Sequence, residues 1–191
     1  SRLSFLQGNY ITLTNMSDHD IDRIIKYHLE PINISFHTTN PELRCKMLHN
    51  RFAGDALKKV DKLYEAGIQM NGQIVLCKGI NDGKELERSI AELSQYLPYL
   101  QSVSVVPVGL TKYREGLHPL EPFTKADALE VLKVIEEAGP NPCPPMVVGV
   151  GIGGTMDKAC VLAKKALTRD ISSSNENPFY KELEEKLLDK I

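Results

Sequence analysis

The stretch NPCPPMVVGVGIGGTMDKA, residues 141–159, holds the residues whose types and spacing are best suited to chemistry. Cys143 lies in a run of prolines, which fix the backbone around it and prevent a helix. The glycines that follow allow a tight turn and a close backbone approach; they are Gly151, Gly153 and Gly154. A helix that begins at Thr155 would direct free N–H groups to the same place, where an anion can bind. The stretch therefore predicts an anion cradle, an iron–sulfur ligand or a strand-to-helix turn.

Known nucleotide loops fit this stretch poorly. The phosphate-binding pattern GxxxxGK[ST] is absent, and GxGxxG fits only from Gly149 to Gly154 with its last glycine shifted. We therefore do not favour dinucleotide binding, and the structural turn stays the general alternative.

The four cysteines are far apart, at positions 45, 77, 143 and 160. No CxxC or CxxxCxxC motif occurs, so no local motif supplies a complete metal site. Such spacing is typical of reduced thiols in a cytosolic protein, and it predicts a cytoplasmic location.

The overall composition is that of an ordinary globular protein. The 191 residues suffice for one sizeable core, and 42% of them are apolar. A net charge of −2 gives no global field for nucleic acid or an anionic membrane. The longest apolar stretch is too short to span a bilayer. We therefore expect a small-molecule substrate, and neither nucleic acid nor membrane as a partner. The start SRLSFLQ, which lacks an initiator methionine, is typical of a processed or excised piece.

Short β-branched runs alternate with segments that carry apolar residues at helical spacing. The predicted strands cover 9–14, 32–37, 72–77, 102–108 and 146–150. The predicted helices begin after Ser17, at Pro41, after Thr124 and after Thr155, or cover 54–66, 83–97 and 178–190. Asp20 and Asp127 complete capping-box patterns at two of these helix starts.

This order predicts an α/β fold of alternating βα units, with a parallel sheet buried on both faces and a C-terminal helix. A partial TIM-like barrel and an open sheet both fit. In either case the functional surface lies in the loops at the carboxyl ends of the strands. These loops read TNMSD, HTTNPE, CKGIND, GLTKYREG and GIGGTMD.

Four segments of the first 135 residues match a known family: GNYITLTN, INISFHTTNPELRCKMLHNRFAGDAL, AGIQMNGQIVLCKGINDGKELERSI and VSVVPVGLTKYREGLHPLEPFT. With them, residues 1–135 resemble the radical S-adenosylmethionine (radical SAM) proteins, in particular a group with a PDZ-like domain and an uncharacterised C-terminal domain. The resemblance implies a partial barrel with S-adenosylmethionine as a cofactor. It also implies a [4Fe–4S] cluster held by a CxxxCxxC loop, whose place would be before Ser1 and which does not occur in this sequence.

The same resemblance implies residues for binding the nucleoside at the strand ends. They are Asn9 and Thr14 with Gly8, Ser35 and His37 with Thr38, and Asn81 with Asp82. Each has a structural alternative. A strand-end histidine usually makes a hydrogen bond, and the Asn-Asp pair is typical of a turn and a helix cap. Cys77 fits a small buried apolar residue, and Lys112 with Arg114 fits either an anion site or a solvated loop.

The last segment has a second resemblance. EEAGPNPCPPMVVGVGIGGTMDKACVLAKKALTR and NPFYKELEEKLLDKI make residues 136–191 similar to the α-subunit of iron–sulfur fumarate hydratases and tartrate dehydratases. This implies that Cys143 is one of three ligands to a [4Fe–4S] cluster whose free iron removes hydroxide from a 2-hydroxy dicarboxylate. The other ligands stand in no matching motif here, so a second chain would be needed to complete the site. Gly151, Gly153, Gly154 and Thr155 would form the anion-binding turn described above, for which a structural strand-to-helix turn is the alternative.

The sequence thus predicts two family fragments joined near residues 133–140. The first hypothesis is an iron–sulfur-enzyme-derived protein of the radical SAM type that lacks its cluster loop and is inactive alone. The second is a hydro-lyase fragment that uses Cys143. The third is a non-enzymatic chimeric or designed α/β scaffold.

Overall fold

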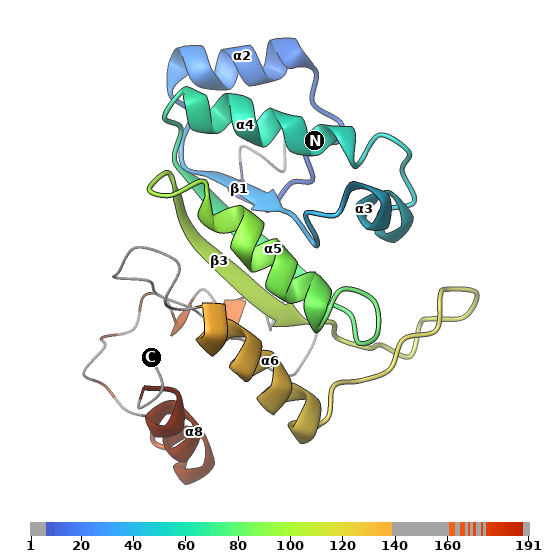
Figure 1. The fold of residues 1–191 in the computed structure, drawn as a ribbon, viewed down its shortest axis with the longest axis vertical. Helices are drawn as coiled ribbons and strands as arrows, with labels where there is room; N and C mark the ends of the chain where they lie inside the picture. Colours follow the sequence, from blue (N-terminus) through green and yellow to red (C-terminus); the bar gives the residue numbers. More distant parts are fainter. Residues whose placement is uncertain are drawn as a thin grey trace.

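The computed structural model describes residues 7–138 and, further along, residues 161, 162, 165, 166, 168, 170, 173 and 175–188. Within these residues helices and strands alternate along the chain, as Figure 1 shows. The elements are α2 (Asp18–Tyr27), β1 (Ile32–Ser35), α3 (Pro41–Met47), the 3-10 helix η1 (Asp55–Leu57), α4 (Lys58–Glu65), β2 (Met70–Leu76), α5 (Lys84–Ser94), β3 (Leu100–Pro107), α6 (Lys125–Ala138) and α8 (Pro178–Leu188). Among the described helices, none is both long and apolar enough to cross a membrane.

The three described strands form one parallel sheet in the order β1-β2-β3. Ile32–Ser35 of β1 lies opposite Met70–Gln73 of β2, and β2 lies opposite Leu100–Pro107 of β3. The predicted α/β fold with alternating βα units and a parallel sheet is confirmed. Of the two architectures that the sequence allowed, the described strands form the open sheet.

The predicted strand 9–14 is reduced to a single parallel bridge between Ile11 and Ile34. The Ile11 N–H donates to the Asn33 carbonyl at 2.9 Å, and the Ser35 N–H donates to the Ile11 carbonyl at 2.8 Å. Pairing cannot continue because Leu13, two residues later, has a φ of 61°, in the left-handed region. The segment still lies beside β1, as expected, but it turns where a strand would have gone on.

One face of the sheet carries the apolar core. Side chains of a strand alternate between faces, so Ile74 and Leu76 of β2 share a face with Ile34 and Val105 of its neighbours. Helix residues complete this core, namely Ile21, Ile24, Val60, Leu63, Leu86 and Leu93. Figure 1 shows α5 lying across β3 on this side.

The other face of the sheet is polar toward its amino end and apolar at the pair Val75 and Val106, which differs from the continuous apolar burial expected for a parallel sheet. Two rows of residues run across the three strands in register: Asn33, Asn71 and Ser102, then Ser35, Gln73 and Ser104. The second row is buried, with 7%, 5% and 1% exposure, respectively. Buried polar groups are unfavourable unless they find hydrogen-bond partners. Polar residues at these positions therefore indicate a role other than packing of the core.

Helix starts follow the capping patterns closely. Ser17 and Asp20 form a capping box at α2, and the Thr124 hydroxyl accepts a hydrogen bond from the Asp127 N–H at 3.3 Å before α6. α2 ends at Tyr27, earlier than the expected stop at Pro31, because His28 takes a left-handed conformation and caps it.

Other boundaries shift by a few residues. The helix predicted for 54–66 is η1 followed by α4, and α5 ends at Ser94, three residues before the predicted end. The predicted C-terminal helix is present as α8. The predicted strand 146–150 lies outside the described residues.

Candidate functional site

Arg44 of α3 joins the carboxyl ends of neighbouring chain segments. Its Nη2 donates to the carbonyls of Thr12 and Ser35 at 2.8 and 2.9 Å, and its Nε donates to the Phe36 carbonyl at 2.9 Å. Its Nη1 donates to the Ala53 carbonyl. The guanidinium therefore ties the segment beside β1, the end of β1 and the loop before η1 to one point.

The Arg44 side chain is a buried cation with 0% exposure. Among the described residues no carboxylate pairs with it, and its four hydrogen bonds there all go to backbone carbonyls. Burial lowers the pKa of Arg44 to about 10, which leaves the guanidinium charged at neutral pH. The sequence reasoning missed this residue, because an arginine in a short polar helix normally faces water.

Two left-handed corners lie directly beside this cation. Leu13 has a φ of 61° and follows the Thr12 carbonyl that Arg44 binds. His37 has a φ of 63° and follows the Phe36 carbonyl that Arg44 binds. Bulky residues rarely adopt this conformation, and where they do, the surrounding contacts must hold them in it.

His37 presents a neutral imidazole at the carboxyl end of β1. Burial and, to a smaller extent, the Arg44 charge together lower its pKa to about 4. Within the described part of the chain no hydrogen bond reaches the His37 ring, although its backbone N–H and carbonyl are both bonded. A half-buried neutral imidazole of this kind can accept or donate a hydrogen bond to a ligand.

Asn81 braces the ends of β1 and β2. Its Oδ1 accepts from the Cys77 N–H at 2.7 Å, and its Nδ2 donates to the His37 and Val75 carbonyls at 2.6 and 3.0 Å. Asn81 is 1% exposed, and these three hydrogen bonds all go to backbone groups. Asp82 accepts from the Gly79 N–H at 2.9 Å and closes the turn. The two residues thus hold the strand ends together.

The predicted residues Thr14 and Ser35 lie on either side of the Arg44 contacts. The Thr14 and Thr12 hydroxyls are 2.8 Å apart and hydrogen-bonded. From α4, Lys59 Nζ donates to the carbonyls of Leu13 and Met16 at 2.9 and 2.6 Å. Two cations therefore fix the loop after Ile11.

Asn9 is placed apart from these residues. It precedes the Ile11 bridge, so in a parallel arrangement it lies toward the amino ends of the strands. Its exposed side chain donates to Gln7 at 3.3 Å, and the neighbouring Gly8 carbonyl accepts from Asn33 at 2.6 Å. The structure brings Thr14, Ser35, His37 and Asn81 to one edge and leaves Asn9 at the other.

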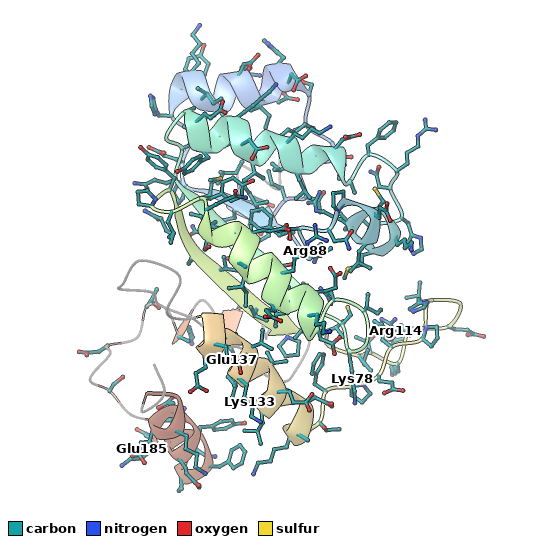
Figure 2. All side chains as sticks on the ribbon, in the orientation of Figure 1. Lys78, Arg88, Arg114, Lys133, Glu137 and Glu185 are labelled. Carbon is teal, nitrogen blue, oxygen red and sulfur yellow. The ribbon has the colours of Figure 1, made fainter. Side chains whose placement is uncertain are left out.

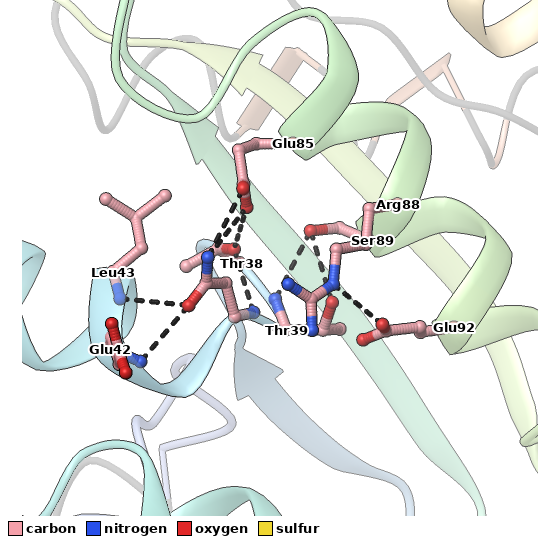
Figure 3. A network of polar contacts seen from close by, with 9 residues as sticks. Thr38, Thr39, Glu42, Leu43, Glu85, Arg88, Ser89 and Glu92 are labelled. Atoms are coloured by element: carbon pink, nitrogen blue, oxygen red, sulfur yellow. Dashed lines mark hydrogen bonds and ion pairs between the residues drawn. The ribbon is translucent and has the colours of Figure 1, made fainter.

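The loop after His37 is tied to the start of α5, as the close-up in Figure 3 shows. Asn40 Nδ2 donates to Glu85 at 3.2 Å, and the Thr39 N–H donates to the Ser89 hydroxyl at 3.2 Å. The Thr38 hydroxyl lies 3.5 Å from the same Glu85 carboxylate. These contacts attach the loop that follows His37 to the first turns of α5.

The polar face of the sheet adds a hydrogen-bonded ladder. Asn71 Nδ2 donates to Asn33 at 3.1 Å, and the Ser102 hydroxyl donates to Asn71 at 2.8 Å. In the next row the Ser104 hydroxyl is buried and, among the described residues, has no hydrogen-bond partner. These groups are uncharged, and uncharged donors and acceptors suit a ribose or a base better than a phosphate.

Three further cations lie in two loops: Lys78 in the loop after β2, and Lys112 and Arg114 in the long loop after β3. Lys78 Nζ lies 2.9 Å from Asp127 and 3.8 Å from Glu121, and Figure 2 places it beside the start of α6. Arg114 donates to the His118 carbonyl at 2.7 Å, and Lys112 lies over the Tyr113 ring. The contacts of Arg114 and Lys112 lie within their own loop, in agreement with the solvated-loop alternative for these two residues.

The two described cysteines, Cys45 and Cys77, occupy positions that are typical of a structural role. Cys77 is buried, and burial raises the pKa of its thiol. The Cys45 sulfur accepts from the Gly54 N–H at 3.3 Å. Across the described ranges no group of three or more His, Cys, Asp or Glu residues is arranged to hold a metal. Cys143, Gly151, Gly153, Gly154 and Thr155 lie outside the described residues.

Several known proteins are similar to parts of this chain. Residues 112–191 match the family model for fumarate hydratase. An Escherichia coli L(+)-tartrate dehydratase subunit alpha is 44% identical over 57 residues, which are 30% of this chain and 19% of that protein. A Methanocaldococcus jannaschii protein assigned to the same subunit is 45% identical over 82 residues, which are 40% of this chain and 29% of that protein. The chain thus spans less than a third of the length of these relatives.

Two solved structures resemble the fold. A radical SAM methyltransferase from Sphaerobacter thermophilus has a TM-score of 0.47 and 21% identity, over 73% of this chain and 40% of that one. A domain of pyruvate-formate lyase-activating enzyme from Bacteroides vulgatus has a TM-score of 0.48 and 13% identity, over 75% and 83%.

The family models confirm both resemblances that the sequence predicted, while the PDZ-like domain stays a prediction. Residues 1–103 match the model described as a radical SAM-like domain. Since this match covers more than half of its length, the chain belongs to the radical SAM-like domain family.

Proposed function

We propose that the carboxyl edge of the described sheet binds S-adenosylmethionine or a closely related adenosine compound. The observation that carries this proposal is the neutral His37 imidazole, held in a left-handed corner between the Arg44 and Asn81 contacts. Thr14 and Ser35 add hydroxyl groups near the same edge, and the adjoining polar face is uncharged. Hydroxyls, amides and a neutral imidazole are suitable partners for a ribose and a purine.

We further propose that these 191 residues bind such a ligand without cleaving it. Reductive cleavage in the family requires a [4Fe–4S] cluster, which supplies the electron. None of the four cysteines stands in a CxxxCxxC loop, so this sequence has no such set of ligands. The part played by the chain's own residues is then to bind and orient the nucleoside.

Isothermal titration calorimetry of the full chain with S-adenosylmethionine and S-adenosylhomocysteine tests the proposal. The informative variant is His37→Asn, because asparagine adopts the left-handed conformation readily and preserves the corner. We expect it to weaken binding by roughly tenfold through the loss of one ligand hydrogen bond.

The matched control is His28→Asn. His28 also has a positive φ, of 48°, but it is exposed at the end of α2. Equal affinities for the wild type and both variants would refute the assignment of His37, and no heat with either ligand would refute the binding site.

A second function is supported by the fumarate hydratase match. We propose that Cys143 is a ligand to a [4Fe–4S] cluster that a partner chain completes, with a 2-hydroxy dicarboxylate as the substrate class. Gly151, Gly153, Gly154 and Thr155 would then bind an anionic group of the substrate. The two family segments would meet near residues 133–140, at the end of α6.

Anaerobic reconstitution with iron and sulfide tests this second function. We expect the brown visible absorption of a cluster, which Cys143→Ala should abolish and the controls Cys45→Ala and Cys77→Ala should retain. Colour that survives Cys143→Ala would rule out this cysteine as a ligand.

A further inference from the structure

We propose that Arg44 is a positioning residue for the nucleoside site: its guanidinium holds the two left-handed corners at Leu13 and His37 and so fixes where the His37 side chain stands. This inference rests on the proposed function for its biological meaning. Its structural content is independent of that function, because it concerns contacts within the chain.

The geometry of the contacts supports this role. Arg44 binds the carbonyl directly before each corner, those of Thr12 and Phe36, at 2.8 and 2.9 Å. A peptide group whose carbonyl is held cannot rotate freely, so the φ of the following residue is restricted as well. One side chain therefore restrains both corners and couples them to each other.

A guanidinium is suited to this task in a way that an ammonium is not. It presents five N–H donors in a rigid planar fork, whereas lysine presents three donors from one point. Here the fork reaches carbonyls on three separate segments, those of Thr12, Ser35 and Ala53 among them. Lys59, by comparison, reaches two carbonyls of a single loop.

The third segment provides a firm base for the fork. A Cβ added at Gly54 would lie 2.8 Å from the Pro41 Cβ, so the loop that carries the Ala53 carbonyl packs tightly against the start of α3. Arg44 itself belongs to α3. The guanidinium is thus anchored on one rigid side, and the two corners are restrained on the other.

Stability alone gives a weak reason for this arrangement. A fully buried cation such as Arg44, which has no carboxylate partner in the described part of the chain, has a large desolvation cost, and apolar replacements of buried charges are often neutral or stabilising. Residues held in unusual conformations cluster at binding and active sites, where the surrounding contacts keep them in place. A buried fork that binds the carbonyls before two such residues fits a site that must be preorganised.

The test compares Arg44→Lys and Arg44→Met with Lys59→Met in the full chain. Lys59→Met is the matched control, because it removes a cation that binds the same loop after Ile11. The readouts are the His37 pKa from an NMR titration of its ring, the exchange rates of the amides at the two corners, and the affinity for S-adenosylhomocysteine.

Arg44→Lys should keep the charge and lose the fork. We expect the His37 pKa to stay low in this variant, because burial and the positive charge both remain, while the corner amides exchange faster. Affinity should fall by roughly tenfold, because the His37 side chain is then no longer held in its binding position before the ligand arrives. Arg44→Met should raise the His37 pKa, because the neighbouring charge is gone. Lys59→Met should leave the His37 pKa unchanged.

The possible failures can be told apart. If the wild type binds neither nucleoside, the proposed function fails, and the corner exchange rates and the His37 titration still decide the role of Arg44. Arg44→Lys with wild-type exchange at both corners would overturn the inference. So would a failure of both Arg44 variants to fold while Lys59→Met folds, since Arg44 would then be required by the fold as a whole.

Discussion

The surroundings of His37 lower the pKa of its imidazole and so make the stability of the chain depend on pH. Its pKa in the folded chain is about 4, against an ordinary value of 6.5, because burial and then the Arg44 charge disfavour the imidazolium. Between these pH values the unfolded chain binds a proton that the folded chain does not. The contribution of His37 to stability is therefore fully present above about pH 6.5 and is lost as the pH falls to about 4.

We predict that this loss amounts to about 1–3 kcal/mol in the wild type, after allowance for partial exposure of the ring. Urea unfolding at intervals across this pH range should show it. His37→Asn should remove this part of the pH dependence, whereas His28→Asn should keep it. An identical pH profile for His37→Asn and the wild type would contradict the assignment.

At Ser104 we predict a substitution that stabilises the chain. Its hydroxyl is buried and has no hydrogen-bond partner among the described residues. Removal of an unpaired buried polar group is favourable, so we predict that Ser104→Ala stabilises the chain by about 1 kcal/mol. Ser102→Ala is the contrasting variant, because the Ser102 hydroxyl donates to Asn71 at 2.8 Å and its loss should destabilise. Thermal unfolding measures both, and a lower melting temperature for Ser104→Ala would show that its hydroxyl has a partner in solution.

At the level of single residues, the sequence predicted positions better than contacts. Asn81 and His37 could be placed at strand ends because they follow β-branched runs. Arg44 could not be found, because its burial depends on carbonyls outside its own helix, one of them 32 residues away in the sequence. Such a contact leaves no periodic signal in the helix that carries it.

Between elements, the brace formed by Asn81 joins the ends of β1 and β2. Its Oδ1 accepts from the Cys77 N–H at 2.7 Å, and its Nδ2 donates to the His37 and Val75 carbonyls. We predict that Asn81→Ala lowers the free energy of unfolding by about 2–4 kcal/mol, since buried backbone groups lose their partner. Asn9→Ala, on an exposed residue, should change it by less than about 0.5 kcal/mol. Similar values for the two variants in urea unfolding would refute the structural role of the brace.

The elements themselves show which signals in the sequence are reliable. Capping patterns and helical periodicity located α2 and α6 at their first residues, because these are local interactions. The segment 9–14 reads as a strand, yet it pairs only at Ile11, because the turn at Leu13 is held by Arg44 and Lys59 from other helices. The polar rows across the sheet were also missed, since they appear only once the three strands are aligned.

For the molecule as a whole, the two matched segments are in contact through α6. The radical SAM-like match ends at residue 103, and the fumarate hydratase match begins at residue 112, before α6. Yet α6 packs its apolar side chains against the core of the sheet, with Val131, Val134 and Ile135 among the contacts. A division of the chain at residue 135 stays a proposal, but the helix before it is physically part of the first core.

This packing predicts that the described sheet and α6 unfold together. Ile135→Ala removes a side chain that packs on the core, and it should lower the free energy of unfolding by about 1–2 kcal/mol, less than for a fully buried isoleucine. Leu129→Ala, on the same helix but 47% exposed, should cost less than about 0.5 kcal/mol.

Hydrogen exchange at the β2 amides, Met70–Leu76, is the decisive measurement, because these residues lie in the middle strand. If the unit is cooperative, Ile135→Ala should accelerate their exchange in proportion to the stability lost, and Leu129→Ala should not. Unchanged β2 exchange in Ile135→Ala would mean that α6 unfolds independently of the sheet. The two matched segments would then be separate cooperative folding units.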